Sequence, residues 1–114
     1  MPGCVLRTRG SECPLPVELV TSKTKSGYIF SVGVADGDDF KAQLAEATSF
    51  LSQHSAALQR AATSPDFSAE LDFGVWNGAP NAISQSFAFP LPLIALASQC
   101  SVELELSIYL ASDP

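Results

Sequence analysis

Four carboxylates lie at alternate positions of two segments in which apolar and polar residues alternate. Glu70 and Asp72 lie in one segment, and Glu103 and Glu105 lie in the other. Paired carboxylates perform acid–base chemistry when their surroundings separate their pKa values, and a converging group can hold Mg²⁺ or Ca²⁺. We favour a simpler interpretation, a solvated acidic face, because four adjacent like charges repel one another. Arg7 and Arg9 could pair with some of these acids, for little stability on an exposed face.

Other chemistry-bearing residues are sparse. His54 is the single histidine, and its spacing places it at the edge of a helical apolar stripe. No Gly-x-Ser-x-Gly motif supplies a nucleophile for it. Cys4, Cys13 and Cys100 have no CxxC spacing, so we expect free thiols and no zinc site. A Cys4–Cys13 disulfide would require an exported protein. We predict no catalytic residue, no metal site and no cofactor.

Large aromatic residues on polar faces are the best indication of recognition. Trp76 shares a strand face with Asp72, and Tyr109 shares a face with the glutamates of the last strand. Asn77 and Asn81 follow in a loop. Tryptophan and tyrosine dominate interface hot spots. We therefore name Trp76, Asn77, Asn81, Tyr109 and Asp72 as candidate binding residues, with ordinary packing of the rings against the loop as the alternative.

Strands are predicted wherever apolar and polar residues alternate. The strongest case is residues 102–110, and residues 69–76 repeat its pattern with alternate apolar side chains facing inward. Further strands are expected at residues 3–9, 27–35 and 83–89.

Two helices are predicted. The first runs from about residue 39 to 62, because apolar residues recur there at spacings of three, four and seven after acidic capping residues. The second covers Leu91 to Gln99 and begins with prolines. Residues 13–26 are expected to form a loop with one helical turn at Val17–Val20.

The order of these elements from residue 27 to 110 indicates a ferredoxin-like βαββαβ core. We therefore expect an α+β fold, with an antiparallel sheet of four to five strands and two helices on one face. Strands 28–35 and 84–89 would be central, and residues 3–9 would add an extra strand at an edge. In that order the segments that carry the four carboxylates lie at opposite edges and cannot converge. Another antiparallel order remains possible.

Length and composition restrict the class of protein. With 114 residues the chain is expected to form one domain, residues 1–114. The net charge is −6, and six basic residues cannot form a large basic patch, which argues against nucleic acids and anionic membranes. No long apolar run or secretory signal is present, so a cytoplasmic location is expected. Only 16% of residues are charged, which favours a homodimer or another buried protein contact.

The carboxy-terminal half contains motifs that resemble those of a known family. They are Leu71-Asp72-Phe73-Gly74-Val75-Trp76, then Phe87-x-Phe89-Pro90, a Leu/Ala-rich helix and Glu103-Leu104-Glu105-Leu106-Ser107-Ile108-Tyr109. An opening Cys-Val-Leu-Arg-x-Arg-Gly strand is compatible with the same family. In that order the motifs resemble the bacterial DUF4279 domains, whose function is unknown. The resemblance implies a fold and a bacterial origin, and it implies no catalytic residue.

We therefore expect a bacterial, non-catalytic binding domain. An immunity-like protein that binds a basic toxin is one specific form of this hypothesis, because an acidic surface suits a basic partner. The alternatives are a small-ligand-sensing domain with a pocket beside Trp76 or Tyr109, and a metal-assisted hydrolase built on Asp72, Glu103 and Glu105.

Overall fold

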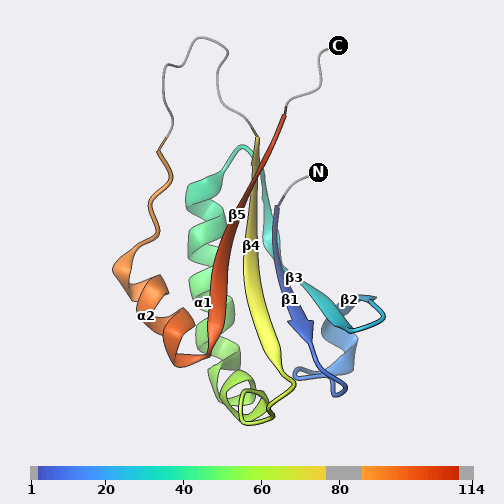
Figure 1. Ribbon diagram of the computed structural model, residues 1–114. Helices are drawn as coiled ribbons and strands as arrows, with labels where there is room; N and C mark the ends of the chain where they lie inside the picture. Colours follow the sequence, from blue (N-terminus) through green and yellow to red (C-terminus); the bar gives the residue numbers. More distant parts are fainter. Residues whose placement is uncertain (1–2, 77–85, 111–114) are drawn as a thin grey trace.

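The protein has an α+β fold in which two helices cover one face of a five-stranded sheet (Figure 1). The computed structural model describes residues 3–76 and 86–110. In chain order the elements are β1 (Gly3–Arg9), η1 (Val17–Leu19), β2 (Val20–Lys23), β3 (Gly27–Asp36), α1 (Phe40–Ala61), β4 (Ser68–Trp76), α2 (Leu91–Gln99) and β5 (Val102–Tyr109).

The sheet is mixed, so the prediction of a purely antiparallel sheet is wrong. Its strand order is β2-β3-β1-β4-β5, and three of the pairs are antiparallel. The fourth pair, β4 with β5, is parallel and runs without a break from Ala69 opposite Val102 to Trp76 opposite Tyr109. Parallel neighbours require a crossover connection, and the stretch of chain that contains α2 provides it.

The amino-terminal strand is central, which corrects its predicted place at an edge. β1 lies between β3 and β4 and pairs with both. The predicted strand 83–89 lies in part outside the described residues, and residues 86–89 are not a strand. The ferredoxin-like order is therefore not confirmed. β2 was not predicted, because its exposed polar residues lack the apolar alternation that marks a half-buried strand.

Both helices confirm the sequence prediction. In α1 the side chain of Asp39 caps the first turn by accepting a hydrogen bond of 3.0 Å from the backbone N–H of Ala42. In α2 a proline occupies the first turn, where its missing N–H costs nothing. No helix in the ranges 3–76 and 86–110 has the length and apolar character needed to cross a membrane.

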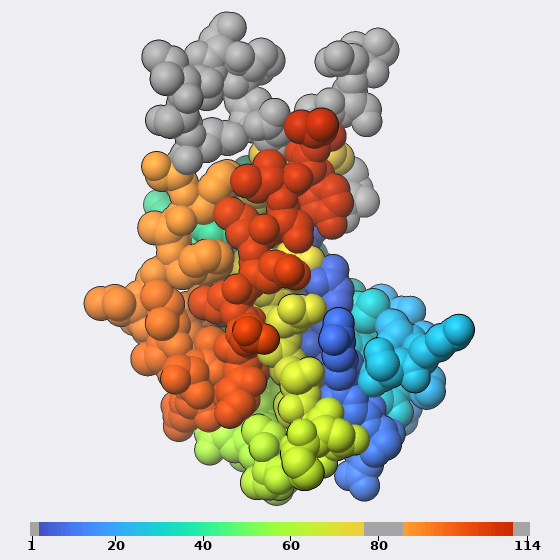
Figure 2. Space-filling model, viewed as in Figure 1, coloured from blue at the N-terminus to red at the C-terminus, as the bar shows by residue number. Residues whose placement is uncertain are grey.

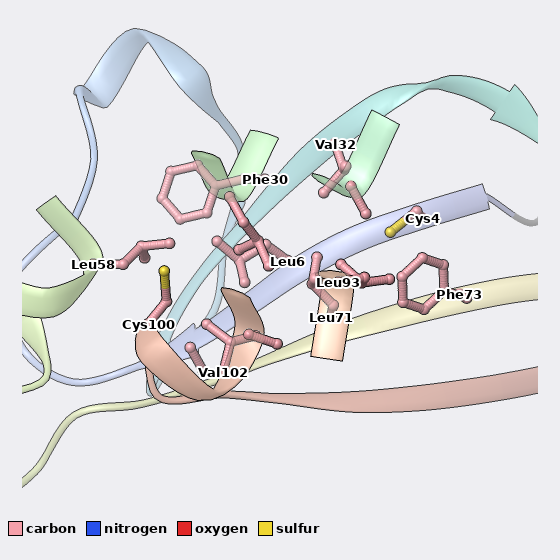
Figure 3. Packing of buried hydrophobic residues seen from close by; sticks show 14 of the residues in the cluster. Cys4, Leu6, Phe30, Val32, Leu58, Leu71, Phe73, Leu93, Cys100 and Val102 are labelled. Atoms are coloured by element: carbon pink, nitrogen blue, oxygen red, sulfur yellow. The ribbon is translucent and has the colours of Figure 1, made fainter. Parts of the chain in front are cut away.

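The hydrophobic core lies between the helices and the inner face of the sheet (Figure 3). Side chains from all five strands, both helices and the turn before η1 meet there. The residues with no exposed surface include Leu6, Phe30, Leu51, Leu58, Leu71, Phe73 and Leu93. The opposite side of the sheet is called the outer face below; it carries Val5 and Arg7 of β1 and the alternate residues of β4 and β5 that include Asp72 and Glu105. No helix in the described ranges covers it (Figure 1).

A bulge in β3 is held by a carboxylate from α1. The register of β3 with β1 shifts between Val5, which faces Ser31, and Gly3, which faces Asp36. Inside the bulge the backbone N–H groups of Val34 and Ala35 donate to the two carboxylate oxygens of Glu46, at 2.9 and 3.0 Å. These hydrogen bonds satisfy two backbone donors that have no partner strand.

Gly33 gives this carboxylate its space. A Cβ atom at residue 33 would lie 2.2 Å from Cδ of Glu46. We expect Gly33→Ala to push the carboxylate away from both N–H groups and to lower the free energy of unfolding by about 1–3 kcal/mol, measured by urea denaturation. In a Glu46→Ala background, Gly33→Ala should lower the free energy of unfolding much less, because no carboxylate remains to be displaced. Equal costs in both backgrounds would contradict this role of Glu46.

Candidate functional site

The parallel pairing of β4 with β5 brings the four carboxylates together on the outer face. Glu70 lies opposite Glu103, and Asp72 lies opposite Glu105. The prediction that these acids lie at opposite edges and cannot converge is therefore wrong. The reason is the central position of β1, which leaves the place beside β4 free for β5.

Arg7 of β1 reaches into this group of carboxylates. Its guanidinium lies 2.7 Å from Oδ2 of Asp72, 3.3 Å from Oε1 of Glu105 and 3.8 Å from Oε1 of Glu70. Burial alone would lower the pKa of Arg7, but the hydrogen bond and charge of Asp72, with the charges of Glu70 and Glu105, raise it above its ordinary value. Arg7 is therefore a permanent cation at the centre of the cluster.

Asp72 is a structural residue of the outer face. It is 4% exposed, although aspartate is seldom fully buried without a partner. One carboxylate oxygen binds Arg7, and the other accepts a hydrogen bond of 2.7 Å from Oγ of Ser107. The contacts join β1, β4 and β5, so the candidate binding residue Asp72 serves to connect three strands.

The cluster is poorly suited to the predicted metal-assisted chemistry. A hard divalent cation needs several carboxylate oxygens that carry excess negative charge. The guanidinium of Arg7 already occupies the side of Asp72, Glu105 and Glu70 that such a cation would use, and it repels one. Within residues 3–76 and 86–110 no group of three or more histidine, cysteine or acidic side chains is arranged to hold a metal ion.

Trp76 and Tyr109 lie together at the carboxyl ends of β4 and β5. They are directly opposite in the parallel register, and their ring centroids are 6.3 Å apart with the planes at 69°. Such edge-to-face contacts stabilise aromatic pairs. Tyr109 remains 45% exposed. The other two candidates, Asn77 and Asn81, lie outside the described residues.

The histidine and the cysteines have structural surroundings. His54 packs against Phe50 with 4.6 Å between ring centroids, and partial burial lowers its pKa. Burial, followed by the charges of Asp72 and Glu46, raises the pKa of Cys4 to about 12, and burial also raises the pKa of Cys100. Cys4, Cys13 and Cys100 are all free thiols, as predicted.

A pocket that the sequence did not predict lies away from the aromatic pair. It has a volume of about 330 Å³ and lies between the loop after β1, the end of α1 and the loop before β4. Cys13, Arg60, Asp66 and Phe67 contribute to its walls. Neither Trp76 nor Tyr109 lines it, and its residues come from three loops or helix ends that no shared sequence motif connects.

Comparison with known proteins identifies no relative. No protein-family model matches the chain, and no curated protein or solved structure matches it. The resemblance to DUF4279 domains therefore stays a prediction, and the function has to be argued from the outer face itself.

The Arg7–Asp72 ion pair gives a first prediction for this site. Arg7→Met removes the cation but keeps most of the apolar stem, so the buried carboxylate of Asp72 is left unpaired. We expect the free energy of unfolding to fall by about 2–3 kcal/mol, a value below that of fully buried pairs because the Arg7 side chain is 38% exposed. Urea denaturation followed by circular dichroism measures the loss.

A neighbouring arginine supplies the control. Arg9 is exposed on the same strand and has no ion pair within the described residues, so Arg9→Met should change stability by no more than about 0.5 kcal/mol. Adding Asp72→Asn to Arg7→Met should recover part of the loss, because the buried position no longer carries an unpaired charge. If Arg7→Met and Arg9→Met cost the same, the ion pair does not stabilise the sheet.

The thiols give a second prediction. In the native protein we expect one fast-reacting thiol, Cys13, because Cys4 and Cys100 are 5% and 0% exposed and burial disfavours their thiolates. Titration with a chromogenic disulfide reagent should show two further thiols only after urea is added. Cys13→Ser should abolish the fast phase, and a fast phase that survives this substitution would show that the core opens readily.

Proposed function

We propose that this chain is a non-catalytic binding domain, and that the outer face of β4 and β5 binds a basic protein partner. The observation that supports this proposal best is the grouping of acidic and aromatic residues on one face, which no helix in residues 3–76 and 86–110 covers. Four carboxylates and the Trp76–Tyr109 pair lie on two adjacent strands there.

The charge balance of this face favours a basic partner. Glu70, Asp72, Glu103 and Glu105 outnumber the arginines of β1, and Arg7 satisfies chiefly Asp72, its nearest partner at 2.7 Å. Glu103 is exposed and takes no part in the ion pairs of Arg7. The whole chain has a net charge of −6, so its overall charge also attracts a basic partner. Complementary potentials accelerate association and exclude partners of the wrong charge.

The aromatic pair adds an apolar anchor beside the charges. Trp76 and Tyr109 support each other edge to face at the ends of their strands, so little side-chain entropy is lost when a partner covers them. Tyr109 still exposes 45% of its surface. An interface centre of rigid rings with an acidic rim is typical of protein–protein recognition.

An immunity-like protein is the specific form of this function that we favour. Such a protein blocks a basic toxin by covering its active surface, and it needs a stable acidic scaffold without chemistry of its own. A bacterial, cytoplasmic origin belongs to the same proposal and is supported by the DUF4279-like motifs and the small acidic chain.

The competing functions have weaker support. The central guanidinium of Arg7 argues against a metal-assisted hydrolase, because it competes with a divalent cation for the same oxygens. A small-ligand sensor would use the pocket of about 330 Å³ rather than the predicted place beside the aromatic residues. That pocket is lined by residues of opposite charge, Arg60 and Asp66 among them, which gives no single ligand class.

The proposal is tested by capture of a partner from the cells that encode the protein. The immobilised chain should retain a basic protein at low ionic strength and release it at high ionic strength. Trp76→Ala should weaken the isolated complex roughly 30-fold, the loss expected for an interface hot spot. Glu103→Lys should slow association, measured by surface plasmon resonance.

A charge-matched variant separates the outer face from net charge. Glu18→Lys makes the same change in charge on η1, next to β2 at the opposite edge of the sheet. This variant should bind nearly as well as the parent chain. The outer face is excluded as the binding surface if two results are found together. Glu103→Lys and Glu18→Lys bind the partner equally well, and Trp76→Ala binds it as tightly as the parent chain.

A further inference from the structure

The two edges of the sheet end in different ways. On the β2 side the edge strand has four residues, includes Lys23 and has an irregular register with β3. Beyond it the carboxylate of Glu46 binds the N–H groups of Val34 and Ala35. Short strands, lysines, bulges and covered backbone groups are the means by which proteins prevent unwanted strand pairing. This edge is therefore protected.

The β5 edge is neither short nor irregular and has no lysine; its charged residues are Glu103 and Glu105, which lie on the outer face. β5 has eight residues, contains no proline, glycine or basic residue, and pairs with β4 in an unbroken register. No strand of the described chain pairs with its other side. Figure 2 shows β5 running along the surface between α2 and β4. A long, regular strand with free backbone donors and acceptors is a template for another strand.

Apolar surface is exposed at both ends of this edge. Ile108 and Leu110, at the carboxyl end of β5, are 54% and 77% exposed. α2 lies beside the amino-terminal half of β5 (Figure 1), and its residues Leu91 and Ile94 are 78% and 42% exposed. The amino-terminal half of the β5 edge thus has α2 beside it, with exposed apolar residues. The carboxyl half has exposed apolar residues of its own and no helix beside it.

We propose that the β5 edge binds a second copy of this chain by antiparallel strand addition about a two-fold axis at Leu106. The inference is independent of the partner proposed for the outer face. In a two-fold pair the same surface is used by both copies, and two edge strands of one sheet then run antiparallel. The result is one continuous sheet across both copies.

Charge selects this register among the alternatives. Opposite residues must share a face, because apolar and polar side chains alternate along β5. With the axis at Leu106, Glu103 faces Tyr109 and Glu105 faces Ser107, so no glutamate faces another. An axis at residue 104 or 105 would place glutamate opposite glutamate, which destabilises a pair of strands. An axis at Ser107 avoids this repulsion but pairs fewer residues.

The same register covers the exposed apolar residues. Leu104 of each copy faces Ile108 of the other on the inner face of the sheet. The two-fold axis also carries α2 of one copy toward the carboxyl half of the other β5, where Leu91 and Ile94 can cover Ile108 and Leu110. Each half of the edge supplies what the other half lacks, so the edge is complementary to itself.

The first experiment measures the mass of the full chain in solution. Analytical ultracentrifugation over a range of concentrations should show a dimer. Ile108→Lys should raise the dissociation constant more than about 100-fold, because the symmetric interface receives two unpaired charges. Ile108 is half exposed in the single copy, so circular dichroism and the urea midpoint should show that the variant still folds.

The protected edge supplies a matched control. Val34→Lys makes a similar change at a residue that is 96% exposed on β3, and it should leave the dimer intact. A parent chain that is monomeric at about 100 µM, or a dimer that Val34→Lys and Ile108→Lys weaken equally, overturns the proposal. A dimer that is lost in neither variant overturns it as well.

Cross-linking tests the register. In a Cys13→Ser background, Leu106→Cys places each new thiol opposite its own copy, within reach of a disulfide. Leu104→Cys places the two thiols four positions apart along the strands, roughly 14 Å, which is too far. Oxidation should therefore give a covalent dimer for Leu106→Cys alone. Efficient cross-linking of Leu104→Cys instead would disprove the axis at Leu106.

Discussion

A carboxylate that is taken out of water needs a cation beside it, and in this protein that requirement connects three strands. Asp72 on β4 is 4% exposed and finds its cation in Arg7 of β1, while Ser107 of β5 satisfies its other oxygen. The ion pair requires β1 beside β4, and the hydrogen bond from Ser107 requires β5 on the other side of β4. The outer face therefore rests on a strand from the amino terminus inserted into the middle of the sheet.

The periodicity of the sequence predicts most elements of the fold but not their neighbours. β1, β3, α1, β4, α2 and β5 appear where apolar spacing places them. Alternation specifies which face of a strand is buried and carries no information about the strand beside it. The antiparallel order and the edge position of residues 3–9 were therefore wrong. β2 was missed because Thr21, Ser22 and Lys23 are exposed and have no apolar alternation.

For the candidate site, too, the sequence predicted the residues but not which of them lie together. Its residue types were recognisable, because Trp76, Tyr109 and the four carboxylates occupy polar positions of strongly alternating strands. Their mutual placement followed only from the parallel register of β4 and β5. Asp72 was expected to be accessible and is buried instead. The available signal was Arg7 on the face of β1 that also carries Arg9, because a partly buried arginine needs an acidic partner from another strand.

The carboxylate of Glu46 in the bulge of β3 has a consequence for how large an assembly can grow. A sheet with two free sides can add copies without end, and fibres arise in that way. Here the carboxylate of Glu46 binds two N–H groups of β3 beyond the short edge strand β2, and Gly33 leaves the room for it. Copies that join through the remaining free side use it up in doing so. If the proposed pairing through β5 occurs, it ends at a pair of chains, because the other edge of the sheet is short and irregular.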